Sequence, residues 1–356
     1  MQNYSDLQKN IRDDVVDVFN SIKKKEWIKF KNKNIFLTGG TGPFGFWLLS
    51  TFIFVNNKLS LNAKIYVLTR NKKKKFFSFI KDKSIKVVEG DVRNFKFNIH
   101  KIDFIIHGAT TTASETFNKQ DPFEKFSVLY DGTKRLIKFA KKQKVSKILF
   151  LSSGAVYGNR DKNIRFKEDM KIAPTTNDLN FDISVLAEAK RCAELLLMIF
   201  SKNSNCKVNI ARCFSFVGPF MPLNVHYAIG NFLKDAIQKK KIIINGNPKT
   251  KRSYLYFSDL SIIIWKILLS NKNQEIYNVG SDNHINMLNL AKKIKKISPK
   301  INIELKNKIQ KQKPNFYVPN INKIKKHFRF KIKNKIDKAI KKTYLEILNN
   351  SSFYKL

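Results

Sequence analysis

Three glycines at three-residue spacing, Gly39, Gly42 and Gly45, form the part of the sequence best suited to bind a ligand. They follow an apolar run at 35–38 and precede an apolar stretch at helical spacing. A strand, a glycine turn and a helix in this order are the context of a dinucleotide-binding turn. Gly39 would permit the tight turn, Gly42 would let the backbone approach a pyrophosphate, and Gly45 would let helix and strand pack closely. The helix N-terminus would then face the phosphates.

Two neighbouring positions refine this predicted site. Pro43 has no backbone N–H, so Phe44 and Gly45 must supply the donors of the phosphate turn. The second predicted strand ends in Thr69-Arg70, where a carboxylate for a ribose 2′-hydroxyl is missing and Arg70 could pair with a 2′-phosphate. The sequence therefore weakly favours binding of the 2′-phosphorylated form of the dinucleotide.

The elements that must position this turn alternate along the chain. Strands are predicted over 64–69, 85–89, 102–107, 147–152 and 208–213, with helices over 126–142 and 184–200. Apolar strands that alternate with helices predict an α/β fold with a doubly wound parallel sheet. Ligands of such sheets lie at the carboxyl ends of the strands, which places 69–70, 90–92, 107–110 and 152–154 along one crevice.

We expect three segments along the chain. Residues 1–33 hold an amphipathic helix that packs on the outside, and residues 34–213 form the dinucleotide-binding domain. From residue 214 glycine and proline break the chain into shorter elements. Residues 214–356 are therefore predicted to form a smaller, C-terminal substrate-binding lobe.

The formal net charge of +42 raises the alternative of a nucleic-acid partner. The excess is almost all lysine, spread along the chain and interleaved with asparagine and isoleucine. Arginine, which suits forked contacts to phosphates and bases, is scarce. We therefore expect no nucleic-acid partner, although a basic surface would attract an anionic ligand.

The remaining composition favours a cytoplasmic protein without a metal site. The sequence has no run of 18 apolar residues, and its N-terminus has no basic region followed by an apolar one, so neither a membrane span nor a secretory signal is expected. Cys192, Cys206 and Cys213 show no metal spacing and are expected to be reduced thiols. The five histidines are too dispersed to hold a metal ion together.

Six motifs follow one another in an order typical of one family. They are 38–45 (T-G-G-T-G-P-F-G), 90–92 (G-D-V), 152–158 (S-S-G-A-V-Y-G), 212–219 (R-C-F-S-F-V-G-P), 252–259 (R-S-Y-L-Y-F-S-D) and 277–281 (Y-N-V-G-S). With these motifs the chain resembles the extended short-chain dehydrogenase/reductase superfamily, and more closely its NAD-dependent epimerase/dehydratase branch. The resemblance implies a Rossmann-type fold, NAD or NADP as cofactor, a nucleotide-sugar substrate and a homodimer.

The resemblance also implies the residues of the site. Those for the cofactor are Gly39, Gly42, Phe44, Gly45, Arg70, Asp91, Val92, Ala109 and Lys190. Those for the substrate are Ser215, Asn231 and Arg252, of which Arg252 is expected to bind the diphosphate because a guanidinium fork suits phosphate oxygens. Asp91 and the backbone of Val92 are expected to contact the adenine.

The catalytic positions depart from the family pattern. In the family, a lysine holds the nicotinamide ribose and lowers the pKa of a tyrosine four residues earlier, which takes a proton from a sugar hydroxyl. Here the lysine is Lys190 and the strand-end serine is Ser153, but the tyrosine position is Leu186. Between Tyr157 and Lys190 the sequence has no tyrosine. Tyr157 is thus a conceivable substitute.

The two residues after Ser153 restrict which type of reaction is expected. Dehydratases of this branch carry an Asp-Glu pair there, and decarboxylases a Glu, whereas this chain has Gly154 and Ala155. Elimination of water needs a general acid near the leaving hydroxyl, which these two residues do not supply. The resemblance therefore favours an epimerase-type oxidoreductase. The alternatives are a cofactor-binding protein with little redox turnover, because of Leu186, and a nucleotide-sugar dehydratase or reductase.

Overall fold

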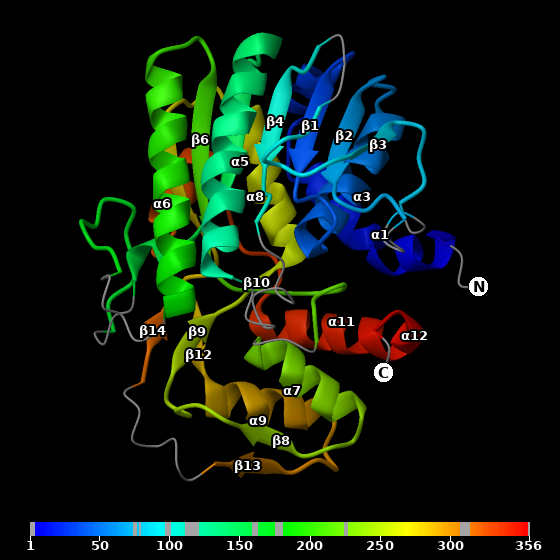
Figure 1. Cartoon of the computed structure of the whole chain (residues 1–356). Coiled ribbons are helices and arrows are strands. Elements are labelled where there is room, and N and C mark those ends of the chain that lie inside the picture. Colours follow the sequence, from blue (N-terminus) through cyan, green and yellow to red (C-terminus); the bar gives the residue numbers. More distant parts are fainter. Residues whose placement is uncertain are drawn as a thin grey trace.

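The structure is a computed structural model of the whole chain (Figure 1). It describes residues 4–73, 77, 80–96, 101–110, 121–158, 163–174, 181–223, 227–306 and 314–354. The strands that it contains are β1 (Asn34–Thr38), β2 (Lys64–Thr69), β3 (Ile85–Glu89), β4 (Phe104–His107), β5 (Lys147–Ser153), β6 (Lys207–Cys213), β7 (Phe216–Val217), β8 (Ile242–Ile244), β9 (Lys251–Ser253), β10 (Leu255–Tyr256), β11 (Glu275–Val279), β12 (His284–Asn286), β13 (Ile303–Leu305) and β14 (Phe316–Tyr317).

The helices lie between these strands and at the two ends of the chain. The α-helices are α1 (Tyr4–Asn20), α2 (Lys24–Trp27), α3 (Pro43–Lys58), α5 (Pro122–Gln143), α6 (Phe181–Lys202), α7 (Ala228–Ile237), α8 (Phe257–Leu269), α9 (Met287–Ile297), α10 (Asn322–Phe328), α11 (Ile336–Asn349) and α12 (Ser351–Tyr354). Two 3-10 turns, η1 (Ile28–Phe30) and η3 (Gly154–Tyr157), follow α2 and β5.

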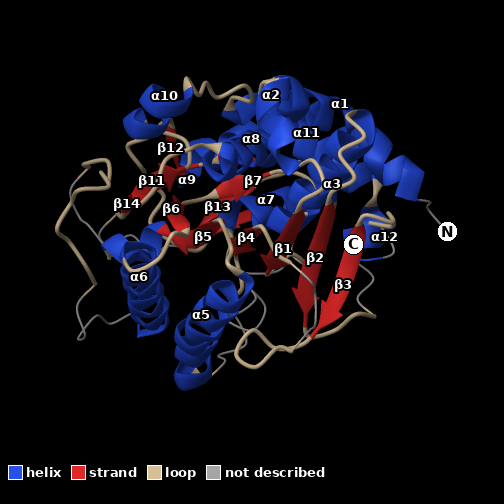
Figure 2. Ribbon diagram, turned by 90° about the horizontal axis from the view of Figure 1, so that it is seen from above, coloured by secondary structure: helices blue, strands red, loops and turns tan. Residues whose placement is uncertain are grey.

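A seven-stranded parallel sheet forms the centre of the molecule, in the order β11-β6-β5-β4-β1-β2-β3. Helices α5 and α6 cover one face, and α1, α3 and α8 cover the other (Figures 1 and 2). The inner strands are apolar runs buried on both faces, as a parallel sheet between two helical layers requires. The prediction of a doubly wound α/β fold is confirmed.

The predicted elements agree with the observed ones except near some ends. Helix α5 begins at Pro122, four residues before the prediction, because Pro122 stands in the first turn and Asp121 caps it by accepting a hydrogen bond from the backbone N–H of Phe123. Strand β4 begins at Phe104 rather than residue 102. The helix predicted within 1–33 forms as α1, followed after a turn by α2.

Shorter elements lie below the carboxyl ends of the central strands (Figure 1). They comprise α7, α9 and α11, the pair β8–β13 and the small sheet β12-β9-β14. All come from residues after 214, but this part of the chain also returns β11 to the edge of the central sheet. Helix α8, from the same part of the chain, packs on one face of that sheet and contacts α1 and α3.

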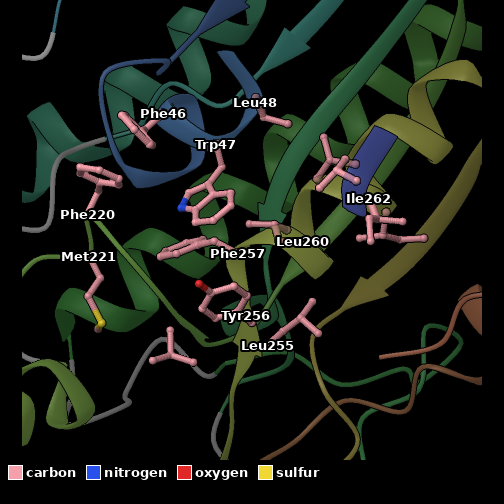
Figure 3. Packing of buried hydrophobic residues seen from close by; sticks show 14 of the residues in the cluster. Phe46, Trp47, Leu48, Phe220, Met221, Leu255, Tyr256, Phe257, Leu260 and Ile262 are labelled. Carbon is pink, nitrogen blue, oxygen red and sulfur yellow. The ribbon is translucent and has the colours of Figure 1, made fainter. Parts of the chain in front are cut away.

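Aromatic packing joins α3 to the segments around 220 and 256 (Figure 3). The Trp47 ring lies 5.7 Å from Tyr256 and 6.3 Å from Phe257, and the Phe46 ring contacts Phe220 at 3.6 Å between centroids. Trp47 also donates a hydrogen bond from Nε1 to the carbonyl oxygen of Pro219 at 3.2 Å. The helix that follows the glycine turn is therefore fixed against the chain that leads into the shorter elements.

Candidate functional site

A cleft of about 1810 Å³ opens at the carboxyl ends of the central strands and extends to the shorter elements. Of the predicted site residues, those that line it are Gly39, Gly42, Phe44, Arg70, Asp91, Val92, Ala109, Ser153, Lys190, Ser215, Asn231 and Arg252. Gly45 is buried behind the turn. Apart from Gly45, the structure thus brings the residues predicted for cofactor and for substrate to one cavity.

The three glycines of the turn face different surroundings. Gly39 has a φ of +73°, and a Cβ at this position would lie 2.4 Å from the backbone of Gly108. A Cβ on Gly45 would lie 1.8 Å from the carbonyl oxygen of Gly40, so this position closes the turn against the start of α3. Gly42 has extended backbone and open space where a Cβ would project. A side chain there would fill the cradle before the α3 N-terminus, so the turn fits a bound pyrophosphate.

Two arginines, Arg70 and Arg93, lie beside Asp91 after the ends of β2 and β3. Arg93 binds both carboxylate oxygens of Asp91, through Nε at 2.9 Å and Nη2 at 3.1 Å, and its backbone N–H donates to Oδ1 at 2.9 Å. Burial opposes ionisation of Asp91, but these hydrogen bonds outweigh it and lower the pKa of the carboxyl. Arg70 adds positive charge beside Asp91 and lines the cleft.

Lys190 is buried where α6 passes the end of β5. Its Nζ donates a hydrogen bond of 2.7 Å to the carbonyl oxygen of Leu151 and lies 4.8 Å from the centre of the Phe150 ring. Burial lowers the pKa of Lys190 to about 8, although Cys213 and Glu194 act in the opposite direction. The ammonium is thus fixed at the same strand end that carries Ser153.

A buried ion pair supports this strand end. Glu194 accepts hydrogen bonds from Ser152 Oγ at 2.5 Å and from Arg212 Nη2 at 2.7 Å. Sequence reasoning missed this network, although Glu194 follows Lys190 by one helical turn and Arg212 opens one of the motifs. The network ties α6, β5 and β6 together directly below the cleft.

The tyrosine considered as a substitute lies away from the cleft. Tyr157 donates a hydrogen bond of 2.7 Å to Asn278 Oδ1, and its ring stacks on Phe166 at 5.0 Å. Burial raises the pKa of Tyr157 to about 12. Leu186, by contrast, lines the cleft. The position that carries the phenol in the family pattern therefore presents an apolar side chain to the site.

The shorter elements line the other part of the cleft. Arg252 on β9 donates from Nη1 to the carbonyl oxygen of Lys251 at 3.0 Å and to Asn315 Oδ1 at 3.3 Å. Its guanidinium lies 5.6 Å from the centre of the Tyr317 ring. Burial lowers the pKa of Arg252. Ser215, which follows β6, and Asn231 of α7 line the same cleft.

The remaining predicted features concern metals, membranes and cysteines. Within the residues that the structure describes, no group of three or more His, Cys, Asp or Glu side chains is placed to hold a metal ion. The same residues contain no helix long and apolar enough to cross a membrane. Cys192, Cys206 and Cys213 are free thiols. His107 is buried between Thr38 Oγ1 at 2.7 Å and Thr133 Oγ1 at 3.1 Å, and burial lowers its pKa to about 3.

Known proteins resemble this chain in sequence. The model of the NAD dependent epimerase/dehydratase family matches residues 35–280. Among curated relatives, a dTDP-D-glucose 4,6-dehydratase of Dictyostelium discoideum is 28% identical over 283 residues, covering 75% of this chain and 62% of the relative. UDP-glucuronic acid decarboxylase 2 of Arabidopsis thaliana is 25% identical over 280 residues, covering 78% and 60%. The chain spans about 60% of the length of these relatives.

Solved structures show the same fold. A UDP-N-acetylglucosamine 4-epimerase from Methanobrevibacter ruminantium M1 superposes with a TM-score of 0.77 at 20% identity, covering 90% of this chain and 99% of that one. The epimerase Mth375 from Methanothermobacter thermautotrophicus superposes with a TM-score of 0.76 at 19% identity, covering 93% and 96%. At such identities the likeness concerns the fold alone.

Proposed function

Because the chain belongs to the NAD dependent epimerase/dehydratase family, we propose that it is a nucleotide-sugar oxidoreductase of the epimerase type with a tightly bound nicotinamide cofactor. The observation that carries this proposal is the single cleft that joins the glycine turn, the pair Ser153 and Lys190, and Arg252. Relatives that share the family pattern are a dTDP-glucose dehydratase and UDP-glucuronic acid decarboxylases. A nucleotide sugar is therefore the substrate class that we assign to the cleft.

The cofactor would be held along the ends of β1, β2 and β5. Gly42 and the N-terminus of α3 would receive the pyrophosphate, Asp91 and Val92 the adenine, and Lys190 the nicotinamide ribose. A nicotinamide bound there would supply reversible acceptance of a hydride from the sugar. Arg70 at the end of β2 supports a lean toward the 2′-phosphorylated cofactor, because a carboxylate that would exclude that phosphate is missing from 69–70.

The substrate would lie between the ends of the central strands and the shorter elements. Arg252 would bind the diphosphate, with Ser215 and Asn231 beside it, while Ser153 would bind the reacting sugar oxygen. We retain the boundary between 34–213 and 214–356 as a proposal about domains. Although β11 and α8 pack with the central sheet, residues after 214 supply the substrate half of the cleft.

A second candidate function is cofactor binding with little redox turnover. Leu186 favours it, because a leucine neither accepts a proton nor binds a sugar oxygen. A dehydratase is less favoured, since Gly154 and Ala155 provide no acid beside Ser153.

Mass spectrometry of the purified protein and a substrate panel separate these functions. We expect retained NAD or NADP, and transient reduced cofactor on adding UDP-glucose, UDP-glucuronic acid or dTDP-glucose. A protein that retains the cofactor but shows no change in its spectrum with any of the three would support the binding function. Absence of cofactor binding would contradict both candidates. Titration with NAD and NADP, repeated for Arg70→Ala, tests the preference for the 2′-phosphorylated cofactor. The variant should lose affinity for NADP more than for NAD.

We also propose a cytoplasmic homodimer. The free thiols support a reducing compartment. Helices α5 and α6 lie side by side, and α6 presents Leu195 and Ile199, which are 62% and 49% exposed and one helical turn apart. Apolar side chains in such a row suit an interface between two copies. Light scattering should detect a dimer that Leu195→Glu converts to a monomer, whereas an unchanged mass in the variant would contradict this interface.

A further inference from the structure

Near the end of β5 the cleft contains one hydroxyl that the motifs identify, that of Ser153. At position 186, where the family pattern has a second hydroxyl, this chain has a leucine. Ser153 Oγ accepts a hydrogen bond from the backbone N–H of Ala155 at 3.1 Å and lines the cleft. Leu186 lines the same region without a polar group. A serine alone is a weak base near neutral pH. Proton exchange with a substrate here would need a second group close to Ser153.

A phenol from a distant part of the chain lies next to Gly154, directly after Ser153, although Tyr317 itself is not among the residues that line the cleft. Tyr317 belongs to β14, which pairs in parallel with β9 and places Tyr317 opposite Arg252. A Cβ on Gly154 would lie 2.5 Å from the Tyr317 hydroxyl oxygen, so this hydroxyl occupies the space that a side chain at position 154 would take. Ser153 is a hydrogen-bond partner of the same hydroxyl. The phenol therefore depends on a glycine at 154 to reach the end of β5.

The ring of Tyr317 is held from several sides. Its centroid lies 4.7 Å from that of Phe214 and 6.2 Å from that of Phe166, and the Arg252 guanidinium lies 5.6 Å away. Phe214, Arg252 and Ser153 all line the cleft. A side chain packed in this way is preorganised, because little rotamer freedom remains to be lost when a ligand binds.

We propose that Tyr317 supplies the proton-transfer hydroxyl that position 186 lacks, and that it exchanges the proton with the reacting oxygen of the substrate through Ser153. This inference rests on the proposed function. It assigns the acid–base group to the end of β14, far from α6 in the sequence. It also distinguishes Tyr317 from Tyr157, because the Tyr157 hydroxyl donates to Asn278 whereas the Tyr317 hydroxyl lies at Gly154, beside Ser153.

The proton balance of the step is closed within the site. During oxidation the sugar carbon gives a hydride to the nicotinamide, the O–H bond of the sugar breaks, and the proton passes through Ser153 to the Tyr317 phenolate. The carbonyl forms as the phenol O–H forms. During reduction the hydride returns to the carbon and the phenol gives its proton back to the new alkoxide through Ser153. Each complete cycle therefore leaves Ser153 and Tyr317 as they began.

The burial of Tyr317 determines which half of the cycle is slow. Burial raises the pKa of Tyr317, and Cys213 and Tyr157 act in the same direction, whereas the hydrogen bond with Ser153 and the charge of Arg252 lower it. The phenol is thus mostly protonated at neutral pH, which suits the reduction. Oxidation needs the phenolate, so its rate should rise with pH while the cofactor is kept saturating.

Single-turnover oxidation of the panel sugars tests the inference with Tyr317→Phe. We expect a loss of about 10²-fold or more in the rate, as for removal of a positioned acid–base group, together with loss of its rise with pH. The affinity for cofactor and for nucleotide sugar, followed by fluorescence, should stay near that of the wild type. Tyr157→Phe is the matched control from the same aromatic cluster and should retain the wild-type rate. The double variant Leu186→Tyr/Tyr317→Phe should recover turnover, because it returns a phenol to the helix that carries Lys190.

The outcomes separate the inference from the function on which it rests. If Tyr317→Phe oxidises the sugars as fast as the wild type, Tyr317 is not the proton-transfer group and the proposed function stands. An equal loss in Tyr157→Phe would attribute the effect to packing and would overturn the inference. A wild type that binds cofactor and nucleotide sugar but oxidises none of the panel contradicts the proposed function, and the inference with it.

Discussion

Lys190 Nζ donates a hydrogen bond of 2.7 Å to the carbonyl oxygen of Leu151, and this contact joins α6 to the end of β5. The bond fixes a buried ammonium beside the cleft rather than leaving a solvated lysine on a helix surface. Glu194, one turn later, binds Arg212 below it. The position of the ammonium is therefore set by three elements, and cofactor binding can depend on its charge.

We predict that affinity for the cofactor falls as pH rises through about 8. Burial lowers the pKa of Lys190 to about 8, so the ammonium loses its proton and its attraction for an anionic ligand above that pH. Fluorescence titrations at about pH 6.5 and about pH 9.5 measure the change. Lys190→Met should bind more weakly at both values and show a smaller pH dependence. Equal affinity of the wild type at the two values would contradict this account.

Substitutions at Gly42 and Gly45 should have opposite consequences, although three residues separate them. Gly42 has extended backbone and open space, so Gly42→Val should fold normally and lose cofactor binding because its side chain fills the phosphate cradle. Gly45→Ala should destabilise the fold by about 1–3 kcal/mol or more, because its Cβ would lie 1.8 Å from the Gly40 carbonyl oxygen. Thermal melts and cofactor titrations distinguish the two effects. Unaltered affinity in Gly42→Val would mean that the turn is not the cofactor site.

The sequence predicts the central sheet well because its signals are local. Each inner strand is a short apolar run bounded by turns, and the glycine turn needs only residues 35–53 to be recognised. The start of α5 depends on the capping chemistry of Asp121 and Pro122, which a search for apolar periodicity does not use. The return of β11 to the sheet edge depends on pairing with β6, a contact between residues more than 60 positions apart in the sequence.

In the candidate site, too, the residues that stand in local motifs could be predicted from the sequence, whereas those that depend on tertiary contacts could not. Lys190 and Ser153 stand in recognisable motifs, and the structure places both at one cleft. Tyr317 carries no motif, since only the pairing of β14 with β9 brings its hydroxyl to Gly154. The direction of the Tyr157 side chain was likewise unreadable, because its partner Asn278 lies on β11. Such contacts follow from tertiary packing, which no local pattern encodes.

We predict that stability decreases as pH rises from about 4.5 through about 7 because of Glu346 on α11. Its carboxylate is buried and accepts hydrogen bonds from Asn350 and Tyr354. Burial raises its pKa to about 7, so the folded state keeps a proton that the unfolded state releases at lower pH. The effect amounts to at most about 3 kcal/mol.

Denaturant unfolding at several pH values, compared with Glu346→Gln, isolates this contribution. The variant should lose the part of the pH dependence that falls in this range. Lys147 acts elsewhere in the profile, because burial lowers its pKa to about 7 and stability from that group increases as pH rises above this value. Parallel profiles of wild type and Glu346→Gln would show that Glu346 does not titrate on unfolding.

We predict that Leu186→Tyr accelerates sugar oxidation. A phenol at this position would stand one helical turn before Lys190 at the same cleft, and a nearby ammonium lowers the pKa of a phenol. Positioned acid–base catalysis contributes about 10²–10⁴-fold. Because Tyr317 is proposed to supply part of this already, turnover on the panel sugars should rise modestly in Leu186→Tyr, and by up to that range only when Leu186→Tyr is compared with its parent in the Tyr317→Phe background. Appearance of reduced cofactor after mixing measures it, with Ser153→Ala and Lys190→Ala as variants that should lose turnover. If Leu186→Tyr leaves the rate unchanged while those two abolish it, another residue already transfers the proton efficiently. Full activity in all three variants would show that the active site lies elsewhere.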